Sequence, residues 1–172
     1  SMATEYRRQV LPVPMVLDAG VRIASALETA HEAGVLHRDI KPSNILITSL
    51  GSPVLADFGI ATALGGGLSA SEFVVEDEDE LVAMSIPWSS PEVLDEATTG
   101  TVASEVWALG ATLFTLLNGR SPFADADRAR NERDQLVARI RKASPKPMTR
   151  DDVPQAVLEV LTRTMRYDPA QR

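Results

Sequence analysis

The 172 residues include 24 acidic and 17 basic side chains, giving a formal net charge of −7, and 44% of the residues are hydrophobic. This length and hydrophobic content suffice for one folded domain with its own core, and the acidic balance argues against a protein that binds nucleic-acid phosphates. The chain has no cysteine and only two histidines, which excludes disulfides and argues against a zinc site. We therefore expect a cytoplasmic protein.

The longest apolar stretch, Val106–Leu117, is interrupted by Gly110 and Thr112. It is too short to cross a bilayer and is typical of a buried helix. The chain also opens without the charged and then apolar segment of a signal peptide. We expect no membrane segment in this chain.

The first element predicted along the chain is a long helix that starts at Pro12 and Pro14 and runs to Ala33. Proline is tolerated at a helix entrance, and Gly34 provides a C-terminal stop. The apolar residues that recur at helical spacing within it are Leu17, Val21, Ala24 and Leu27.

A β-hairpin is predicted next, from the β-type runs Ile45–Thr48 and Val54–Ala56 on either side of a Gly-Ser-Pro turn. Residues 57–92 then lose all periodicity and contain three consecutive glycines at 65–67 and an acidic run at 76–80. A long aperiodic segment within a compact domain is usually functional or disordered.

Three helices are predicted after this segment. Ala103–Asn118 is apolar nearly all round, as is typical of a helix at the centre of a domain, whereas Ala126–Lys142 is heavily charged with a narrow apolar stripe. The apolar face of the last helix comprises Val153, Val157, Val160, Leu161 and Met165. The sequence thus predicts a mainly α fold: a helical bundle around a buried central helix, with one small β-hairpin.

The chemistry is concentrated in residues 37–44, His-Arg-Asp-Ile-Lys-Pro-Ser-Asn, which lie between the first long helix and the hairpin. Phosphoryl transfer needs a carboxylate to orient the attacking hydroxyl and cations to neutralise the charge that grows on the transferred group. Asp39 supplies a carboxylate and Lys41 an ammonium group. Asn44 and Asp57, on either side of the hairpin, offer the oxygen ligands that Mg²⁺ prefers.

These residues resemble the protein-kinase signature H-R-D-x-K-x-x-N followed by D-F-G, with the lysine typical of Ser/Thr kinases. Three further segments resemble later kinase motifs in the correct order: Ser-Pro-Glu at 90–92, the buried-helix motif at 104–110 and Asp-Pro-Ala-Gln-Arg at 168–172. The likeness covers nearly the whole chain. It is similar to bacterial Hanks-type Ser/Thr kinases, and from Val21 to Leu46 most of all to the PknK type.

The resemblance implies a role for each matching residue. Asp39 would be the catalytic base, Lys41 would stabilise the transferred phosphoryl group, and Ser85 would bind both of them. Asn44 and Asp57 would hold Mg²⁺. Leu46 would lie beneath the adenine ring of ATP, so the implied cofactors of the complete kinase are ATP and Mg²⁺, and the implied partner is a protein substrate with a Ser or Thr hydroxyl.

The resemblance also implies structural roles outside the catalytic loop. Glu92 would pair with Arg172, and His37 would pack against Phe58 in a hydrophobic spine. The chain departs from the family at Glu105, where the buried helix normally carries an Asp that accepts hydrogen bonds from the catalytic loop. Because Glu is one methylene longer, we expect the loop to be held differently.

Other candidates have simpler interpretations. We expect His37 to be a packed structural residue rather than a proton shuttle, and His31 to have no role. The glycine run lacks the phosphate-loop pattern and is interpreted as a flexible loop. The acidic run 76–80 remains open: it is either a solvated charge run or a substitute for an activation-loop phosphate that pairs with Arg38, with Ser69 and Ser71 as alternative phosphorylation sites.

A complete kinase site also needs a glycine-rich strand, a strand lysine and a helix glutamate from a smaller lobe. The 36 residues before His37 are predicted to be helical instead. We therefore expect residues 1–172 to be the C-terminal lobe only, without the N-terminal lobe and with little activity alone. The alternative is a non-catalytic half-kinase or pseudokinase that binds a partner. In either case the face near Leu46 and Phe58 should be apolar, and should bind the missing lobe or self-associate.

Overall fold

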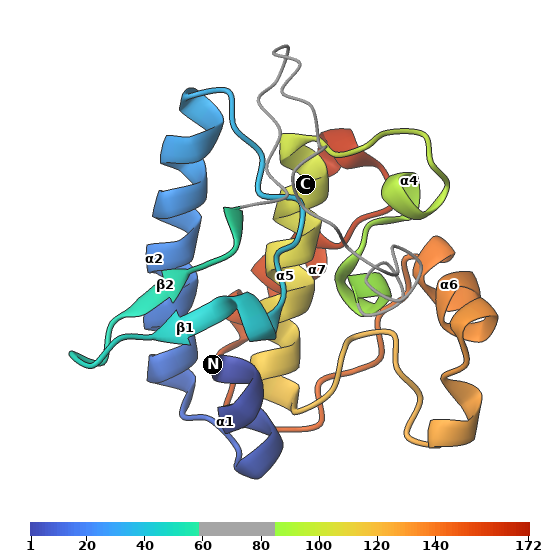
Figure 1. Ribbon diagram of the computed structural model, residues 1–172. Coiled ribbons are helices and arrows are strands. Elements are labelled where there is room, and N and C mark those ends of the chain that lie inside the picture. Colours follow the sequence, from blue (N-terminus) through green and yellow to red (C-terminus); the bar gives the residue numbers. More distant parts are fainter. Residues whose placement is uncertain (59–84) are drawn as a thin grey trace, which may run out of the picture.

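The computed structural model describes residues 1–58 and 85–172 (Figure 1). The glycine run 65–67, the acidic run 76–80, Ser69 and Ser71 lie outside these ranges. The described helices and strands are α1 Met2–Arg8, α2 Val13–Glu32, β1 Ile45–Ile47, β2 Pro53–Leu55, α4 Pro91–Leu94, α5 Val102–Asn118, α6 Arg133–Arg141 and α7 Gln155–Thr164. Short 3₁₀ turns lie at Pro42–Asn44, Ile86–Trp88, Arg128–Arg130 and Pro169–Gln171.

Helix α5 is the centre of the fold and packs against both α2 and α7 (Figure 1). It begins with a capping box, in which Thr101 and Ser104 bond to each other's backbone N–H groups, and ends at Gly119 in the left-handed conformation. Trp107, Ala111 and other side chains on several faces of the helix are buried. The predicted fold class, mainly α around a buried helix with one small hairpin, is confirmed.

Gly110 allows α5 and α7 to approach closely. A Cβ atom at this position would lie 1.9 Å from Oγ1 and 2.7 Å from Cβ of Thr164. These distances are too short for any side chain, so the packing of the two helices requires glycine here.

Helix α2 begins directly after Pro12, as predicted, but part of its predicted buried face is wrong. Val21 is 69% exposed and Ala24 is also exposed. The core side of the helix is formed by Val13, Val16, Ala19, Gly20, Ile23 and Leu27. Several helical stripes of this alanine-rich sequence are apolar, and contact with α5 and β2 selects only one of them.

The residues before His37 were predicted to be helical, but α1 was not predicted as a separate helix, because seven residues give too short a periodic pattern. Met2 and Ala3 are buried, and the helix contacts β1 and the 3₁₀ turn Pro42–Asn44. It therefore supports the end of the loop at 37–44, near the hairpin (Figure 1).

Strands β1 and β2 form the predicted antiparallel hairpin, with Ile45 opposite Leu55 and Ile47 opposite Pro53. Each observed boundary lies within one residue of the prediction. The hairpin runs across α2 (Figure 1), and Ile45 is fully buried at its start.

The predicted helix Ala126–Lys142 is wrong in its first half. The segment forms the 3₁₀ turn Arg128–Arg130 first, and α6 begins only at Arg133. The Asp127 side chain accepts the N–H of Ala129, while the Asn131 side chain bonds to both backbone groups of Asp125. Short polar side chains that bond to nearby backbone compete with helix formation in this way.

Helix α7 has the predicted apolar face except at Val160, which is 61% exposed. Leu161 and Met165 are buried, and Val157 is partly buried against the core. Within residues 1–58 and 85–172, no helix has the length and apolar character needed to cross a membrane.

Candidate active site

Asp39 is the centre of a compact polar cluster on the loop between α2 and β1. The Ser85 hydroxyl donates to its Oδ1 at 2.7 Å, the Asn44 side-chain amide donates to its Oδ2 at 2.9 Å, and Lys41 Nζ lies 2.8 Å from Oδ2. Both oxygens of the carboxylate are thus held by donors. The sequence prediction named the same residues, and the fold brings them together.

Lys41 and Ser85 also bond to each other, since Lys41 Nζ donates to Ser85 Oγ at 3.1 Å. Ser85 lies 46 positions from Asp39 in the sequence and reaches it from the start of the 3₁₀ turn Ile86–Trp88. The Lys41 side chain is buried, so its charge acts on Asp39 with little screening by solvent.

The surroundings of Asp39 keep its carboxyl group ionised. Burial by itself raises the pKa of Asp39, but the hydrogen bonds and charge of Lys41 and the hydrogen bonds from Ser85 and Asn44 outweigh it, so that the pKa lies below its ordinary value. Asp39 is therefore a negatively charged acceptor at neutral pH.

The backbone before Asp39 is held in an unusual conformation by α5. Arg38 has a φ of 68°, in the left-handed region that side chains rarely adopt. Its N–H donates to Oε1 of the buried Glu105 at 2.6 Å, and the Thr112 hydroxyl donates to the carbonyl of Ile40 at 3.3 Å. Glu105 thus bonds to the loop despite being longer than the family's usual Asp.

His31 is half-buried, as predicted, but it makes a contact that the sequence did not predict. His31 lies near the end of α2, and its Nε2 donates to Oε2 of Glu105 at 2.6 Å. Its side chain is largely buried. A histidine near the end of a helix gives no sequence signal for such a contact, because its partner lies 74 positions away.

His37 is a packed structural residue, as predicted. Its Nε2 donates to the carbonyl of Ala56 at 2.8 Å, and its Nδ1 accepts the N–H of Asp39 at 3.2 Å. The ring is fully buried and meets Phe58 edge-on, with ring centroids 4.5 Å apart. Both ring nitrogens are occupied by the backbone, which links the catalytic loop to the end of β2.

The oxygen donors proposed for Mg²⁺ lie on the two sides of the hairpin. The Ala56 N–H donates to the carbonyl of Asn44 at 2.8 Å, which places the residue before Asp57 against Asn44. Asp57 is exposed and has a φ of 64°. An amide oxygen and a carboxylate match the hard-cation chemistry of Mg²⁺, which keeps several waters and phosphate oxygens as its other ligands.

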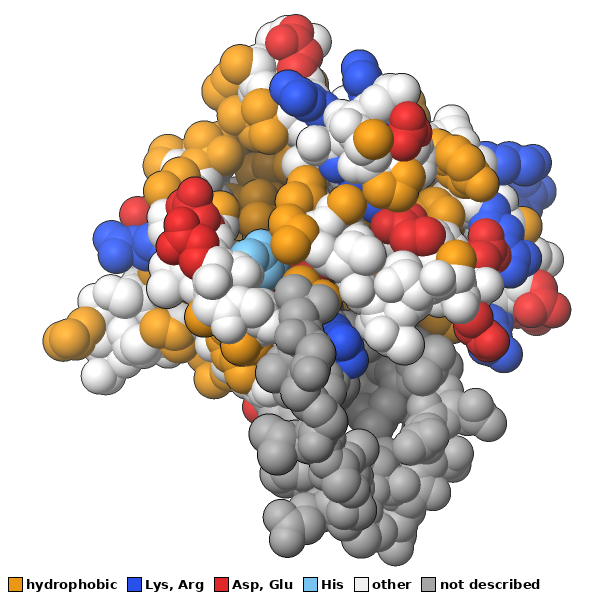
Figure 2. Space-filling view, turned by 90° about the horizontal axis from the view of Figure 1, so that it is seen from above, with side chains coloured by type: hydrophobic (Ala, Val, Ile, Leu, Met, Phe, Trp, Pro, Cys, Tyr) orange, Lys and Arg blue, Asp and Glu red, His pale blue; other side chains and the backbone are white. Residues whose placement is uncertain are grey.

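Apolar side chains are exposed on the hairpin beside these residues. Leu46 is 40% exposed, its cross-strand neighbour Val54 41% and Phe58 37%. Figure 2 shows that hydrophobic side chains are also widespread, with acidic and basic ones between them, on the face that it presents. The hairpin therefore presents an apolar surface next to the candidate metal ligands.

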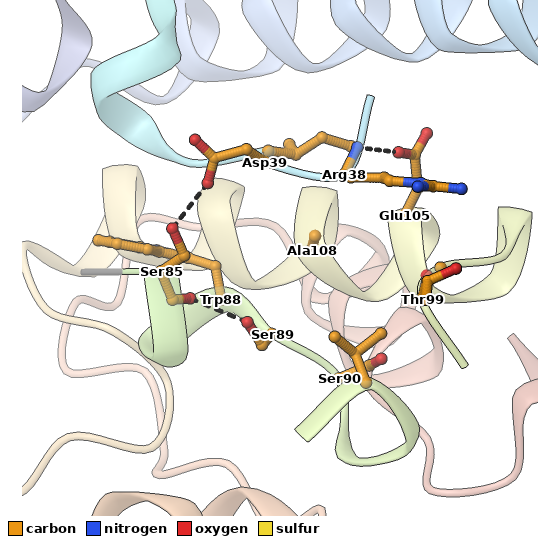
Figure 3. A pocket seen from close by; sticks show the side chains of 13 residues that line it. Arg38, Asp39, Ser85, Trp88, Ser89, Ser90, Thr99, Glu105 and Ala108 are labelled. Carbon is orange, nitrogen blue, oxygen red and sulfur yellow. Dashed lines mark hydrogen bonds between the residues drawn. The ribbon is translucent and has the colours of Figure 1, made fainter. Parts of the chain in front are cut away.

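A small cavity of about 40 Å³ lies beside Asp39. Asp39 and Ser85 lie at one end of it, Arg38 and Glu105 at the other, and Ala108 of α5 forms part of the wall (Figure 3). A larger groove of about 640 Å³ shares Ser89 with this cavity and extends between α4 and α6. The two share the lining residues Ser89, Val93 and Thr99, and Asp39 lines the smaller one.

The Glu92–Arg172 pair predicted from the resemblance is confirmed. Arg172 Nη1 and Nη2 lie 2.5 and 3.0 Å from the two oxygens of Glu92, and the guanidinium group stacks over Trp107 of α5. Burial raises the pKa of Glu92, but the hydrogen bonds and charge of Arg172 more than offset this, so the pKa lies below its ordinary value. The pair joins α4 to the end of the chain.

The family model described as the protein kinase domain matches residues 4–172. The chain belongs to the protein kinase family. It is 38% identical over 159 residues to serine/threonine-protein kinase PknK of Mycobacterium tuberculosis, which covers 91% of this chain and 13% of that protein. It is 32% identical over 169 residues to human ribosomal protein S6 kinase alpha-4, covering 97% of this chain and 20% of that protein. The chain thus spans a small part of the length of these relatives.

Membership in this family of transferases confirms the resemblance drawn from the motifs at residues 37–44 and 168–172. The kinase motifs predicted Asp39, Lys41 and Asn44 of the cluster, and the family resemblance predicted the contact of Ser85 with Asp39 and Lys41. They did not predict the contact of His31 with Glu105, which depends on the relative positions of α2 and α5.

Proposed function

We propose that this chain is the larger, C-terminal lobe of a Ser/Thr protein kinase catalytic domain, and that it supplies the groups that activate the acceptor hydroxyl and hold the metal. The observation that supports this most strongly is the cluster in which Lys41, Ser85 and Asn44 hold both oxygens of Asp39. A binding module has no need for a carboxylate fixed and kept ionised beside a concave surface.

In the proposed reaction, a substrate Ser or Thr hydroxyl enters the cavity beside Asp39. Asp39 orients this hydroxyl and accepts its proton as the oxygen bonds to the γ-phosphorus of ATP and ADP leaves. Lys41 lies beside Asp39 and offsets the negative charge on the transferred group. Ser85 keeps both groups aligned.

Asn44 and Asp57 are the proposed ligands for Mg²⁺, which neutralises charge on the phosphates when it is bound. Their positions on either side of the hairpin support this assignment. Leu46 is the proposed floor for the adenine ring, since it is an exposed apolar side chain on β1 next to Asn44. The remaining ATP contacts are assigned to a smaller lobe packed against the same hairpin.

The proposal is tested in the complete kinase domain with Asp39→Asn, using phosphate transfer from radiolabelled ATP to a Ser-containing protein. Loss of the general base should lower kcat by about 10²–10⁴-fold in a variant that still folds. Asp95→Asn, an exposed aspartate on the same lobe, is the matched control and should retain activity. Full activity of Asp39→Asn would overturn the assignment.

A second candidate, a non-catalytic module that binds a partner, is favoured by the exposed apolar hairpin side chains of Leu46, Val54 and Phe58. Sedimentation of residues 1–172 separates the two. Association that is abolished by Leu46→Lys, together with an inactive complete domain, would support the module. A monomer that gains activity on addition of the smaller lobe would support the kinase.

A further inference from the structure

The connection between α4 and α5 carries several hydroxyl side chains, most of which are engaged in local hydrogen bonds. The Thr98 hydroxyl donates to the carbonyl of Gly100 at 3.2 Å and accepts its N–H at 3.1 Å. Thr101 and Ser104 bond to each other's backbone N–H groups in the capping box of α5. Thr99 differs, because its side chain is exposed and its hydroxyl makes no hydrogen bond within residues 1–58 and 85–172.

Thr99 lines both of the concave regions near the catalytic loop. It belongs to the wall of the 40 Å³ cavity beside Asp39 (Figure 3) and also to that of the 640 Å³ groove between α4 and α6. The serines of these walls are less available as acceptors. Ser85 donates to Asp39 and Ser89 to the carbonyl of Ser85, while Ser90 is buried. Thr99 is therefore the accessible hydroxyl of this surface.

Arginine side chains flank Thr99 on two sides. The next residue, Gly100, packs against Arg38, since a Cβ atom at Gly100 would lie 3.4 Å from Cγ and 3.6 Å from Nε of Arg38. On the other side, the first residue of α6, Arg133, lines the groove together with Thr99. Arg133 is exposed and forms no ion pair within the described parts of the chain.

Arg133 is the cation of the groove that is available to a new anion. The groove's other arginine, Arg141, is already paired with Asp95 at 2.6 Å, and the groove also contains the carboxylates of Glu96 and Asp134. A phosphate group carries a charge of about −1.5 to −2 at neutral pH and has three acceptor oxygens. A guanidinium group binds two such oxygens at once, in a geometry that a single hydroxyl cannot use.

We infer that Thr99 is a phosphorylation site, and that its phosphate binds Arg133 and so ties the α4–α5 connection to the start of α6. The source of the phosphate rests on the proposed function, with a second copy of the kinase as the enzyme. Oγ1 of Thr99 bonds to the γ-phosphorus of ATP, the bond from this phosphorus to the bridging oxygen breaks, and ADP leaves with its electron pair. Asp39 of the second copy accepts the hydroxyl proton. Binding of the phosphate by Arg133 does not depend on which kinase delivers it.

Phosphate binding is tested in the chain with phosphothreonine installed at position 99 by chemical ligation. A neighbouring guanidinium favours the dianion, so the second pKa of the phosphate, measured by phosphorus NMR, should be lower by about half a unit than in Arg133→Ala. Arg128→Ala removes an exposed arginine that does not line the groove, and it is the matched control that should leave this pKa unchanged. The same pKa with and without Arg133 would overturn the inference.

Modification is tested in the complete kinase domain with Mg-ATP, by mass spectrometry of the peptide that contains residues 98–101. Thr99 should carry at least tenfold more phosphate than Thr98, and an Asp39→Asn copy should acquire it only when mixed with active domain. Transfer to a Ser-containing protein is measured in parallel. If that protein is labelled and Thr99 is not, or if Thr98 is labelled equally, the inference is wrong. If neither is labelled, the proposed function fails, while the NMR comparison still decides whether Arg133 binds the phosphate.

Discussion

The loop at 37–44 and the segment at 125–142 are both rich in polar and charged residues. They differ in how deeply these side chains are buried and in how far away in the sequence their partners lie. In the loop, Asp39 and Lys41 are largely buried and are held by Ser85, which is remote in sequence. In the 125–142 segment, Asp125, Asp127 and Asn131 mainly bond to residues within six positions, and most of its charged side chains face solvent.

Two ion pairs near α4 show the same contrast at close range. Glu92 and Arg172 form a double hydrogen bond in which the Arg172 side chain is only 1% exposed. Three residues on, Asp95 pairs with Arg141 of α6 at 2.6 Å, but both side chains are about half exposed. Charge at the surface is screened by water, whereas a buried charge must keep its partner. Substitution in the Glu92–Arg172 pair should therefore lower the stability of the protein far more than substitution in the Asp95–Arg141 pair.

The largest effect on stability is expected from Arg172→Ala. Removing this guanidinium leaves Glu92 without its partner and Trp107 without the stacked group, so the free energy of unfolding should fall by about 3 kcal/mol. Urea denaturation of the chain measures it. A loss no greater than that of Arg141→Ala would remove the contrast between the two pairs.

Ser85→Ala should mainly affect activity. It removes the hydroxyl that donates to Asp39 and accepts from Lys41, so kcat of the complete domain should fall about tenfold, the value of one hydrogen bond to a charged group. Ser89→Ala is the control, because within residues 1–58 and 85–172 its hydroxyl bonds only to the Ser85 carbonyl. An equal decrease of kcat in the two variants would show that the hydrogen bond from Ser85 to Asp39 is not important for activity.

Lowering the pH should reduce the free energy of unfolding through the carboxyl groups of Asp39 and Glu92. The pKa values of Asp39 and Glu92 are lower in the folded protein than their ordinary values, so the unfolded chain binds more protons and stability falls as pH drops. The stabilisation from these two carboxyl groups is fully present above about pH 4.5, the upper end of their ordinary pKa values. It is lost as the pH falls through their lower pKa values in the folded protein. Chemical denaturation between pH 7 and 3 should show this decline, and a smaller one in Glu92→Gln. Identical pH profiles of stability for the unsubstituted protein and Glu92→Gln would contradict the prediction.

The smallest effect is expected from Arg141→Ala. Its pair with Asp95 is exposed, so the free energy of unfolding should change by about 0.5 kcal/mol or less. Raising the salt concentration should reduce even this difference, because exposed charges are screened. A change of several kcal/mol in the same urea experiment would mean that α6 is held far more firmly than its exposed contacts indicate.

The site was largely predictable because its residues lie in short motifs. Asp39, Lys41 and Asn44 occur within six positions, and together with the later motifs in the correct order they indicate phosphoryl transfer to an acceptor hydroxyl. The Glu92–Arg172 pair was predicted only through the family resemblance, since 80 positions separate the two residues. The contact of His31 with Glu105 joins residues 74 positions apart and has no local pattern in the sequence, so it was missed.

The sequence by itself determined the kinase family, the buried character of α5, the hairpin and the chemistry around Asp39, because each depends on local composition or an ordered motif. Only the tertiary structure decided which side of α2 is buried, where α6 begins, and that His31 meets Glu105. These features depend on how distant elements pack. Apolar stripes of similar strength compete until a neighbour covers one of them, and a buried charge accepts whichever donor the packing brings within reach.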